Sequence, residues 1–167
     1  MPLLTVICCH KNASSPAEQL PAATQTGANT IGCLVNGQPW TPQGNNGSSN
    51  YAVSYDPNPY GVFDLTAYRY PIASGKNFES LHIYARNLQT PRTYDLRDLS
   101  LTRITWNDTS TGCELNSDDP GTYHKGTLTI TKRDLQAGIV SGTFAFTLAK
   151  PGCDTVRISN GRFDKKL

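Results

Sequence analysis

The fold is decided by residues 126–164, which carry the sequence GTLTITKRDLQAGIVSGTFAFTLAKPGCDTVRISNGRFD. Three runs in this stretch, 127–131, 140–148 and 156–159, alternate between apolar and polar side chains. Such alternation is typical of β-strands that bury one face. Because short turns connect the runs, we predict an antiparallel meander of three strands.

The apolar side chains of this meander should form part of a core. Leu128 and Ile130 point to one side of the first run, and Phe144 and Phe146 share one side of the second. We therefore expect these four residues to lie in a common buried cluster.

Two glycines predict departures from regular strand geometry. Gly142, in the middle of the second run, predicts a β-bulge or a bend. Asn160-Gly161 predicts a further turn, after which Phe163 returns to the core.

The rest of the chain also predicts short strands separated by turns. Asn36-Gly37 is a strong two-residue turn signal and predicts a hairpin over 30–40. Further strands are expected at 51–55, 60–70, 81–85, 92–96 and 99–106, and no convincing amphipathic helix is present. About eight to ten short strands predict an all-β fold, a single antiparallel β-sandwich or flattened barrel over residues 30–167.

The N-terminal residues differ in composition from the domain. Residues 1–9, MPLLTVICC, are short and apolar, like the end of a lipoprotein signal peptide whose beginning is missing. Cys9 is the better lipidation candidate and Cys8 the alternative, since Cys8 would follow the bulky Ile7. An ordinary disordered N-terminus with two thiols is the other interpretation. Residues 10–29, rich in Ser, Ala, Pro, Gln and Thr, are expected to be a flexible tether.

Several of these motifs together resemble a known family. The motifs are LTITKRD (128–134), IVSGTFAF (139–146), VRISNGRFD (156–164) and ATQTGANTIGCLVNGQPW (23–40). In combination they resemble a family of small lipoproteins of the Bacteroidota, a domain of unknown function numbered DUF6252, over residues 22–42 and 126–165. The resemblance implies a lipid anchor and a β-rich domain, and it implies no activity.

Composition narrows the class of protein. Charged residues make up 17% of the chain and the net charge is +2, which favours neither nucleic acid nor an anionic membrane surface as a partner. This composition suits an extracytoplasmic protein, and the resemblance implies a cell-envelope protein that is lipid-anchored to the outer membrane and faces the periplasm or the cell surface. An acidic cluster after the cysteine would favour surface display, but only Glu18 is present. We expect no cofactor.

The remaining cysteines suggest one disulfide. If Cys9 is lipidated, Cys33, Cys113 and Cys153 remain, and three pairings are open. The hairpin between 127–132 and 139–149 would bring Lys150 near Gly126 and Cys153 to the end of the sheet where residues 113–125 enter. We therefore predict Cys113–Cys153, with Cys33 as a buried thiol; the rival pairing is Cys33–Cys113.

Aromatic side chains are the feature with most potential for binding. Tyr68, Tyr70 and Tyr84 are expected on the outward faces of strands that are neighbours, where such a row would stack on sugar rings or a peptide. Cross-strand aromatic pairs also stabilise a sheet without any ligand.

The sequence supports a catalytic role less well than a binding role. The first hypothesis is a non-catalytic, lipid-anchored envelope domain that binds a glycan or a protein. The alternative is an envelope hydrolase that acts on glycans through carboxylates such as Asp64, Glu79 or Asp95, which would have to face one cleft. We expect no metal site, because Cys-x-x-Cys pairs are absent and His10, His82 and His124 have no shared spacing. The oxygen-rich loop 116–121 favours a solvated turn over a calcium site.

We predict that Cys9 carries a diacylglyceryl group when the gene is expressed with its full upstream signal. Metabolic labelling with palmitate should label the wild-type protein and Cys8→Ser but not Cys9→Ser, because the lipid is attached to the cysteine that follows the cleavage site. Label on Cys9→Ser and none on Cys8→Ser would assign the lipid to Cys8 instead.

Overall fold

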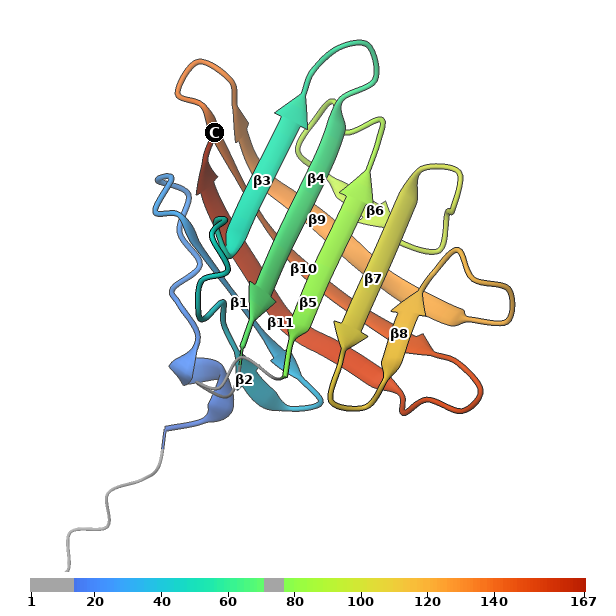
Figure 1. The fold of residues 1–167 in the computed structure, drawn as a ribbon. Helices are drawn as coiled ribbons and strands as arrows, with labels where there is room; N and C mark the ends of the chain where they lie inside the picture. Colours follow the sequence, from blue (N-terminus) through green and yellow to red (C-terminus); the bar gives the residue numbers. More distant parts are fainter. Residues whose placement is uncertain (1–13, 71–76) are drawn as a thin grey trace, which may run out of the picture.

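The structure is a computed structural model that describes residues 14–70 and 77–167. Two antiparallel sheets pack face to face, their strands crossing at an angle, and they do not close into a barrel (Figure 1). The prediction of an all-β antiparallel sandwich is therefore confirmed, and of its two forms the open sandwich is observed. Within the described ranges, no helix is long and apolar enough to cross a membrane.

The strands divide between the sheets as follows. The six-stranded sheet has the order β2-β1-β11-β10-β9-β6, with β1 (Thr30–Val35), β2 (Gln38–Trp40), β6 (Thr93–Asp95), β9 (Tyr123–Asp134), β10 (Ile139–Ala149) and β11 (Val156–Lys166). The five-stranded sheet has the order β3-β4-β5-β7-β8, with β3 (Tyr51–Asp56), β4 (Val62–Arg69), β5 (Glu79–Ala85), β7 (Thr102–Asp108) and β8 (Cys113–Asn116). A short 3₁₀ helix, η1 (Pro16–Gln19), precedes β1.

The predicted meander, β9-β10-β11, is the centre of the six-stranded sheet, but its strands are longer than expected. They contain 12, 11 and 11 residues, and Ala149 pairs with Tyr123, so β9 begins four residues before Thr127. Asn160-Gly161 is not a turn. It forms a bulge inside β11, where Asn160 has a φ of 51° and the register with β10 shifts.

Glycine and phenylalanine face each other across the strands of the meander. Gly126 pairs with Phe146, Gly142 with Phe163 and Gly161 with Phe144. A Cβ atom on any of these glycines would meet the opposite phenylalanine at 2.4–2.8 Å, which is too close for real atoms. The rings of Phe163 and Phe144 occupy the space that a side chain at Gly142 or Gly161 would need, and at Gly126 the Cβ and backbone of Phe146 do so.

The core lies between the two sheets. Leu128, Ile130, Phe144 and Phe146 are all at most 3% exposed and belong to one cluster, as predicted. The five-stranded sheet contributes the inward rows of β4 and β5, and Trp40 packs edge-on against Trp106 with ring centroids 5.8 Å apart.

A disulfide joins the two sheets. Cys113, the first residue of β8, is bonded to Cys153 in the turn between β10 and β11, with Cα atoms 5.9 Å apart. This is the pairing that the sequence predicts, and it closes a loop of 40 residues. Cys33 is buried among the core residues, and its burial raises the pKa of its thiol to about 12, so it stays protonated.

The second half of the segment predicted to be a tether, residues 10–29, packs on the domain. Leu20 is 7% exposed and, with Pro21, covers the bare backbone of Gly32 on the outer side of β1. Cys8, Cys9 and His10 lie outside the described residues.

The Asp164 carboxylate of β11 fastens this N-terminal segment. Asp164 is 1% exposed. Its two oxygens accept hydrogen bonds from Thr24 Oγ1 (2.6 Å), Thr26 N (2.9 Å), Gly27 N (2.9 Å), Ala28 N (3.0 Å) and Ser141 Oγ (2.7 Å). Burial opposes ionisation, but these donors outweigh it and hold the pKa of the carboxyl well below its usual range. A sequence composed of polar tether residues does not reveal this partner, because it lies about 140 residues away in the chain.

We predict that Phe146→Ala lowers the free energy of unfolding by about 3–5 kcal/mol, the usual cost of truncating a buried phenylalanine. Urea denaturation measures the change. Thr147→Ala, the outward-facing neighbour, is the matched control and should change stability by less than about 0.5 kcal/mol. Equal midpoints for Phe146→Ala and wild type would mean that the inner and outer faces of β10 are exchanged.

We predict that Asp164→Asn costs about 2–3 kcal/mol at pH 7, because an amide nitrogen then faces backbone donors and the charge is lost. Since the pKa of Asp164 is lowered in the folded state, its contribution is complete above the unfolded-state value of about 3.9 and is lost as the pH falls below it. The difference between wild type and variant should therefore shrink from pH 7 to pH 3 in urea titrations. Asp154→Asn, on an exposed turn, is the control; a gap of equal size at both pH values would contradict the assigned role.

Candidate functional site

The three tyrosines predicted to face a ligand do not form an exposed row. Tyr68 is 6% exposed, because the loop 44–48 folds over it. Its hydroxyl donates to Asn46 Oδ1 (2.7 Å) and to the Ser48 carbonyl (2.8 Å) as alternative acceptors, and accepts from Asn46 N (3.2 Å). The prediction for Tyr68 is therefore wrong.

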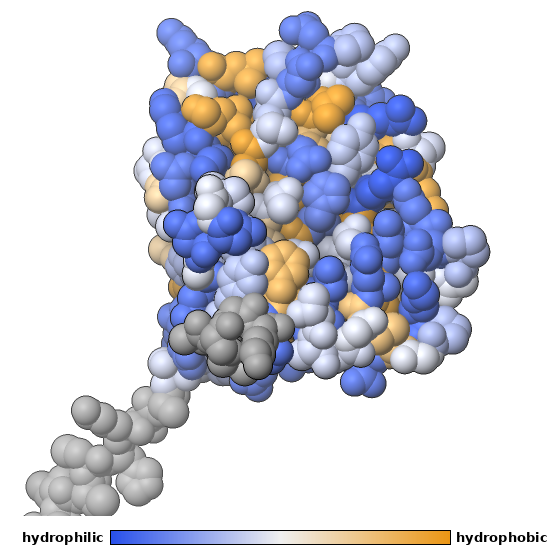
Figure 2. Space-filling model, in the orientation of Figure 1, coloured by the Kyte–Doolittle hydropathy of each residue, from blue (hydrophilic) through white to orange (hydrophobic). Residues whose placement is uncertain are grey.

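Tyr68 and Tyr70 instead belong to an aromatic cluster with Phe78. The ring centroids lie 5.4–5.8 Å apart, so the cluster corresponds to the alternative in which aromatic pairs stabilise the sheet. Tyr84 is half-buried in the middle of the sheet, between Asp64 and Arg103 on the neighbouring strands. Figure 2 shows that this outer face of the five-stranded sheet is mostly hydrophilic.

The carboxylates considered for hydrolysis do not share a cleft. Asp64 lies on β4 of the five-stranded sheet and Asp95 on β6 of the other. A hydrogen bond from His82 (3.0 Å) lowers the pKa of Asp64, and hydrogen bonds from Arg97 lower the pKa of Asp95 to about 2. Both shifts move these groups away from the pKa near neutrality that suits a general acid or base.

Glu79 is also held by partners. It accepts hydrogen bonds from Trp40 Nε1 and from Arg69 Nε, each at 2.7 Å. Arg69 and Glu79 line a pocket of about 330 Å³ near the disulfide, together with Asp108 and Asp154. The Arg69 guanidinium also lies over the ring of Trp40, 5.7 Å from its centroid, and its ion pair fixes the Glu79 carboxylate.

The metal-ligating residue types are not grouped in the part of the chain that the structure describes. In the loop 116–121, Asp118 is paired with Arg103 and Asp119 with Lys150 Nζ (2.9 Å), so both carboxylates bind cationic side chains. His82 and His124 lie on different sheets.

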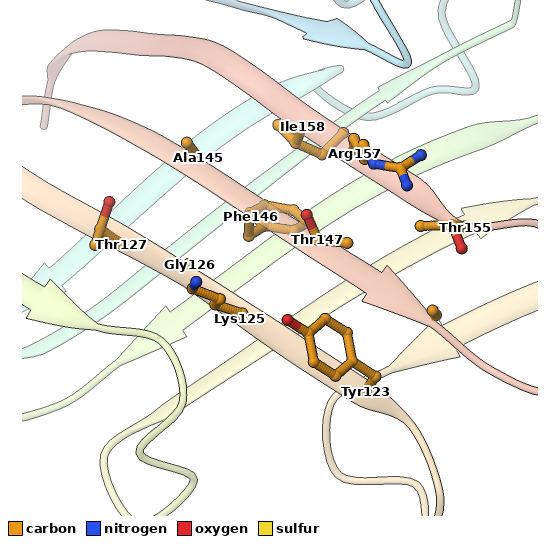
Figure 3. Close-up of a pocket in the computed structure, with 11 residues that line it drawn as sticks. Tyr123, Lys125, Gly126, Thr127, Ala145, Phe146, Thr147, Thr155, Arg157 and Ile158 are labelled. Carbon is orange, nitrogen blue, oxygen red and sulfur yellow. The ribbon is translucent and has the colours of Figure 1, made fainter.

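A wider depression lies on the outer face of the six-stranded sheet. It has a volume of about 620 Å³ and spans β9, β10 and the start of β11 (Figure 3). Small residues make up most of its lining, to which the core residues Phe146 and Ile158 also contribute, and Tyr123, Lys125 and Arg157 stand at its margins. Tyr123 is 56% exposed, and Figure 3 shows its ring lying across β9 with one face toward solvent.

The register of the strands places these residues in rows across the sheet. Lys125 pairs with Thr147, which in turn pairs with Arg157, so the three side chains form one row. Strands are about 4.8 Å apart, so the two cationic residues are separated by roughly 10 Å at their Cα atoms. Tyr123 and Ala149 form the next row.

The match to a family model covers most of these strands. A model described as a domain of unknown function (DUF6252) matches residues 64–165. The chain belongs to this family. The DUF6252 match includes the three C-terminal motifs of the resemblance and every residue that lines the depression, whereas the motif at 23–40 lies outside it. No curated protein and no solved structure matches the chain.

Sequence reasoning missed Tyr123, Lys125 and Arg157 as surface residues of one site. Alternation alone could have placed two of these residues. Tyr123 and Lys125 share the parity of Thr127, so a prediction that β9 begins at Tyr123 would have placed both side chains on the outer face. Arg157 lies on the face opposite to the buried residues Val156 and Ile158, as the alternation of 156–159 predicts. Which strands lie side by side at this point depends on tertiary pairing, and the periodicity of one strand does not encode it.

Proposed function

We propose that this protein is a non-catalytic binding domain of the cell envelope, anchored to a membrane by a lipid on Cys9, and that the depression on β9-β10-β11 is its ligand-binding surface. The lipid anchor and the envelope location are supported by the apolar start and by the resemblance to Bacteroidota lipoproteins. The binding role is supported by the depression. A glycan or a protein of the envelope is the expected partner.

The observation that carries the proposal is the composition of the depression. Small side chains line its floor, and an aromatic ring and two cationic side chains stand exposed around it. An extended ligand lying on such a floor would contact polar and aromatic groups without displacing bulky side chains. Binding sites in general combine a concave surface with a few polar groups that fix orientation.

The part of the N-terminal segment formed by residues 20–28 packs away from this surface. It packs against Gly32 and Asp164, whereas the depression involves β11 near Thr155 and Arg157. Arg157 and Asp164 are seven residues apart on one strand, which corresponds to roughly 20 Å. A domain tethered through its N-terminus would therefore keep the depression accessible, as a binding or scaffolding role requires.

Thr147→Trp should weaken ligand retention at least about tenfold, equivalent to ~1.4 kcal/mol, because the indole fills the centre of the floor. The full chain, immobilised through its C-terminus, is incubated separately with envelope polysaccharide and envelope protein fractions, and the retained material is quantified. Thr143→Trp is the matched control: it is exposed on the same face of the same strand, outside the depression. Equal denaturation midpoints verify folding. Retention that Thr147→Trp leaves unchanged would refute the assigned surface.

A further inference from the structure

Two cationic side chains of the depression, Lys125 and Arg157, differ from the other Lys and Arg side chains that the structure describes. The other described Lys and Arg side chains each contact a carboxylate, a backbone carbonyl or an aromatic ring. Their residues are Arg69, Arg86, Arg92, Arg97, Arg103, Lys132, Arg133, Lys150, Arg162, Lys165 and Lys166. Lys125 and Arg157 have no such partner among the described residues, and both are exposed.

Lys125 and Arg157 form no ion pair with any described residue, although Asp154 lines a neighbouring hollow together with Arg157. No residue that lines the depression carries a carboxylate. Asp95 on the neighbouring strand β6 is close enough to Lys125 to feel its charge, but Arg97 binds its carboxylate at 2.9 Å. The row Lys125–Thr147–Arg157 is therefore a positively charged line across the sheet, complementary to a ligand with spaced negative charges.

The backbone of the floor excludes one mode of peptide recognition. β10 is paired along its length with β9 on one side and β11 on the other. At Arg157, the N–H donates to Asn36 Oδ1 and the C=O accepts from Asn36 N, both at 2.8 Å. A peptide cannot add to these strands as a further strand, so recognition here must use side chains.

The side chains available suit a sugar chain. Hydroxyl groups of Thr127, Thr147 and Thr155 lie on the floor, and the exposed ring of Tyr123 offers one face at its margin. Hydroxyl–hydroxyl hydrogen bonds and stacking of a sugar ring on an aromatic face are the ordinary means of carbohydrate recognition. The roughly 10 Å between the two cationic positions exceeds one sugar ring, so two charges would come from different residues of the chain.

We propose that the depression binds an acidic polysaccharide, whose carboxylate or sulfate groups contact Lys125 and Arg157 and one of whose rings stacks on Tyr123. This inference rests on the proposed function and specifies its ligand. The positive charge of Lys125 and Arg157 favours an acidic polymer. The hydroxyl groups on the floor, together with the fully paired backbone, favour a sugar chain over a peptide.

Titration of the full chain with four polymers tests this proposal. Polygalacturonate carries carboxylates and chondroitin sulfate also carries sulfates, dextran is neutral, and poly-L-glutamate is an acidic peptide. We expect binding of at least one acidic polysaccharide, a weakening with increasing salt, and no binding of dextran. Lys125→Gln and Arg157→Gln should each weaken binding by about threefold to tenfold, and Tyr123→Ala by a similar factor. Preference between the two acidic polysaccharides identifies the anionic group.

Arg103→Gln is the control, since it removes the same charge from the opposite sheet and should leave affinity unchanged. Binding of neither acidic polysaccharide, equal binding of dextran, or binding of poly-L-glutamate as tight as that of the polysaccharides would each overturn the inference. If envelope material is still retained in a manner that Thr147→Trp abolishes, the proposed binding role stands and only its ligand is wrong. If Thr147→Trp has no effect on retention, the binding surface itself is wrong.

Discussion

The structure depends on how glycine and phenylalanine interlock across β9, β10 and β11. Gly142 and Gly161 leave room for the rings of Phe163 and Phe144 on the facing strands, and Gly126 leaves room for the close approach of Phe146. Glycine in a strand normally weakens it, because it has no side chain to pack and loses more freedom on folding. Here the neighbouring ring supplies the missing contact, so three bulky aromatics fit side by side in the thin layer between the two sheets.

The same arrangement shapes the outer face of the sheet. Side chains alternate along a strand, so the positions between the large core residues point outward. In β10 these are Thr143, Ala145, Thr147 and Ala149, all small. Large side chains therefore cover the inner face of the sheet and small ones its outer face. The depression with Tyr123, Lys125 and Arg157 at its margins follows from that difference in side-chain size. Alternate residues of the same strand thus form the core on one face and the floor of the candidate site on the other.

Much of this fold could be predicted from the sequence, and what was missed has identifiable causes. Alternation located β9, β10 and β11, their common core, and the geometry that brings Cys113 to Cys153. Local rules fail where distant residues decide. Asn160-Gly161 has the composition of a turn but serves as a bulge, because Phe144 requires a glycine opposite it. Tyr68 has outward parity but is covered by the loop 44–48. The segment 20–28 has the composition of a linker but is bound by Asp164.

The Asp164 contact also determines how mechanical load would enter the domain. A pull on the N-terminus reaches the contact of Leu20 and Pro21 with Gly32 first, then the segment from Thr24 to Ala28, and only then the backbone of β1. The hydrogen bonds of that segment converge on the Asp164 carboxylate. They would therefore bear the force together and would not break one after another. The load is then carried by β11, which is paired on both sides in the middle of the sheet. A thermal or mechanical disturbance of the leading residues would accordingly stop at this carboxylate, and the face that carries Lys125 and Arg157 would keep its shape while the chain ahead of it is under tension.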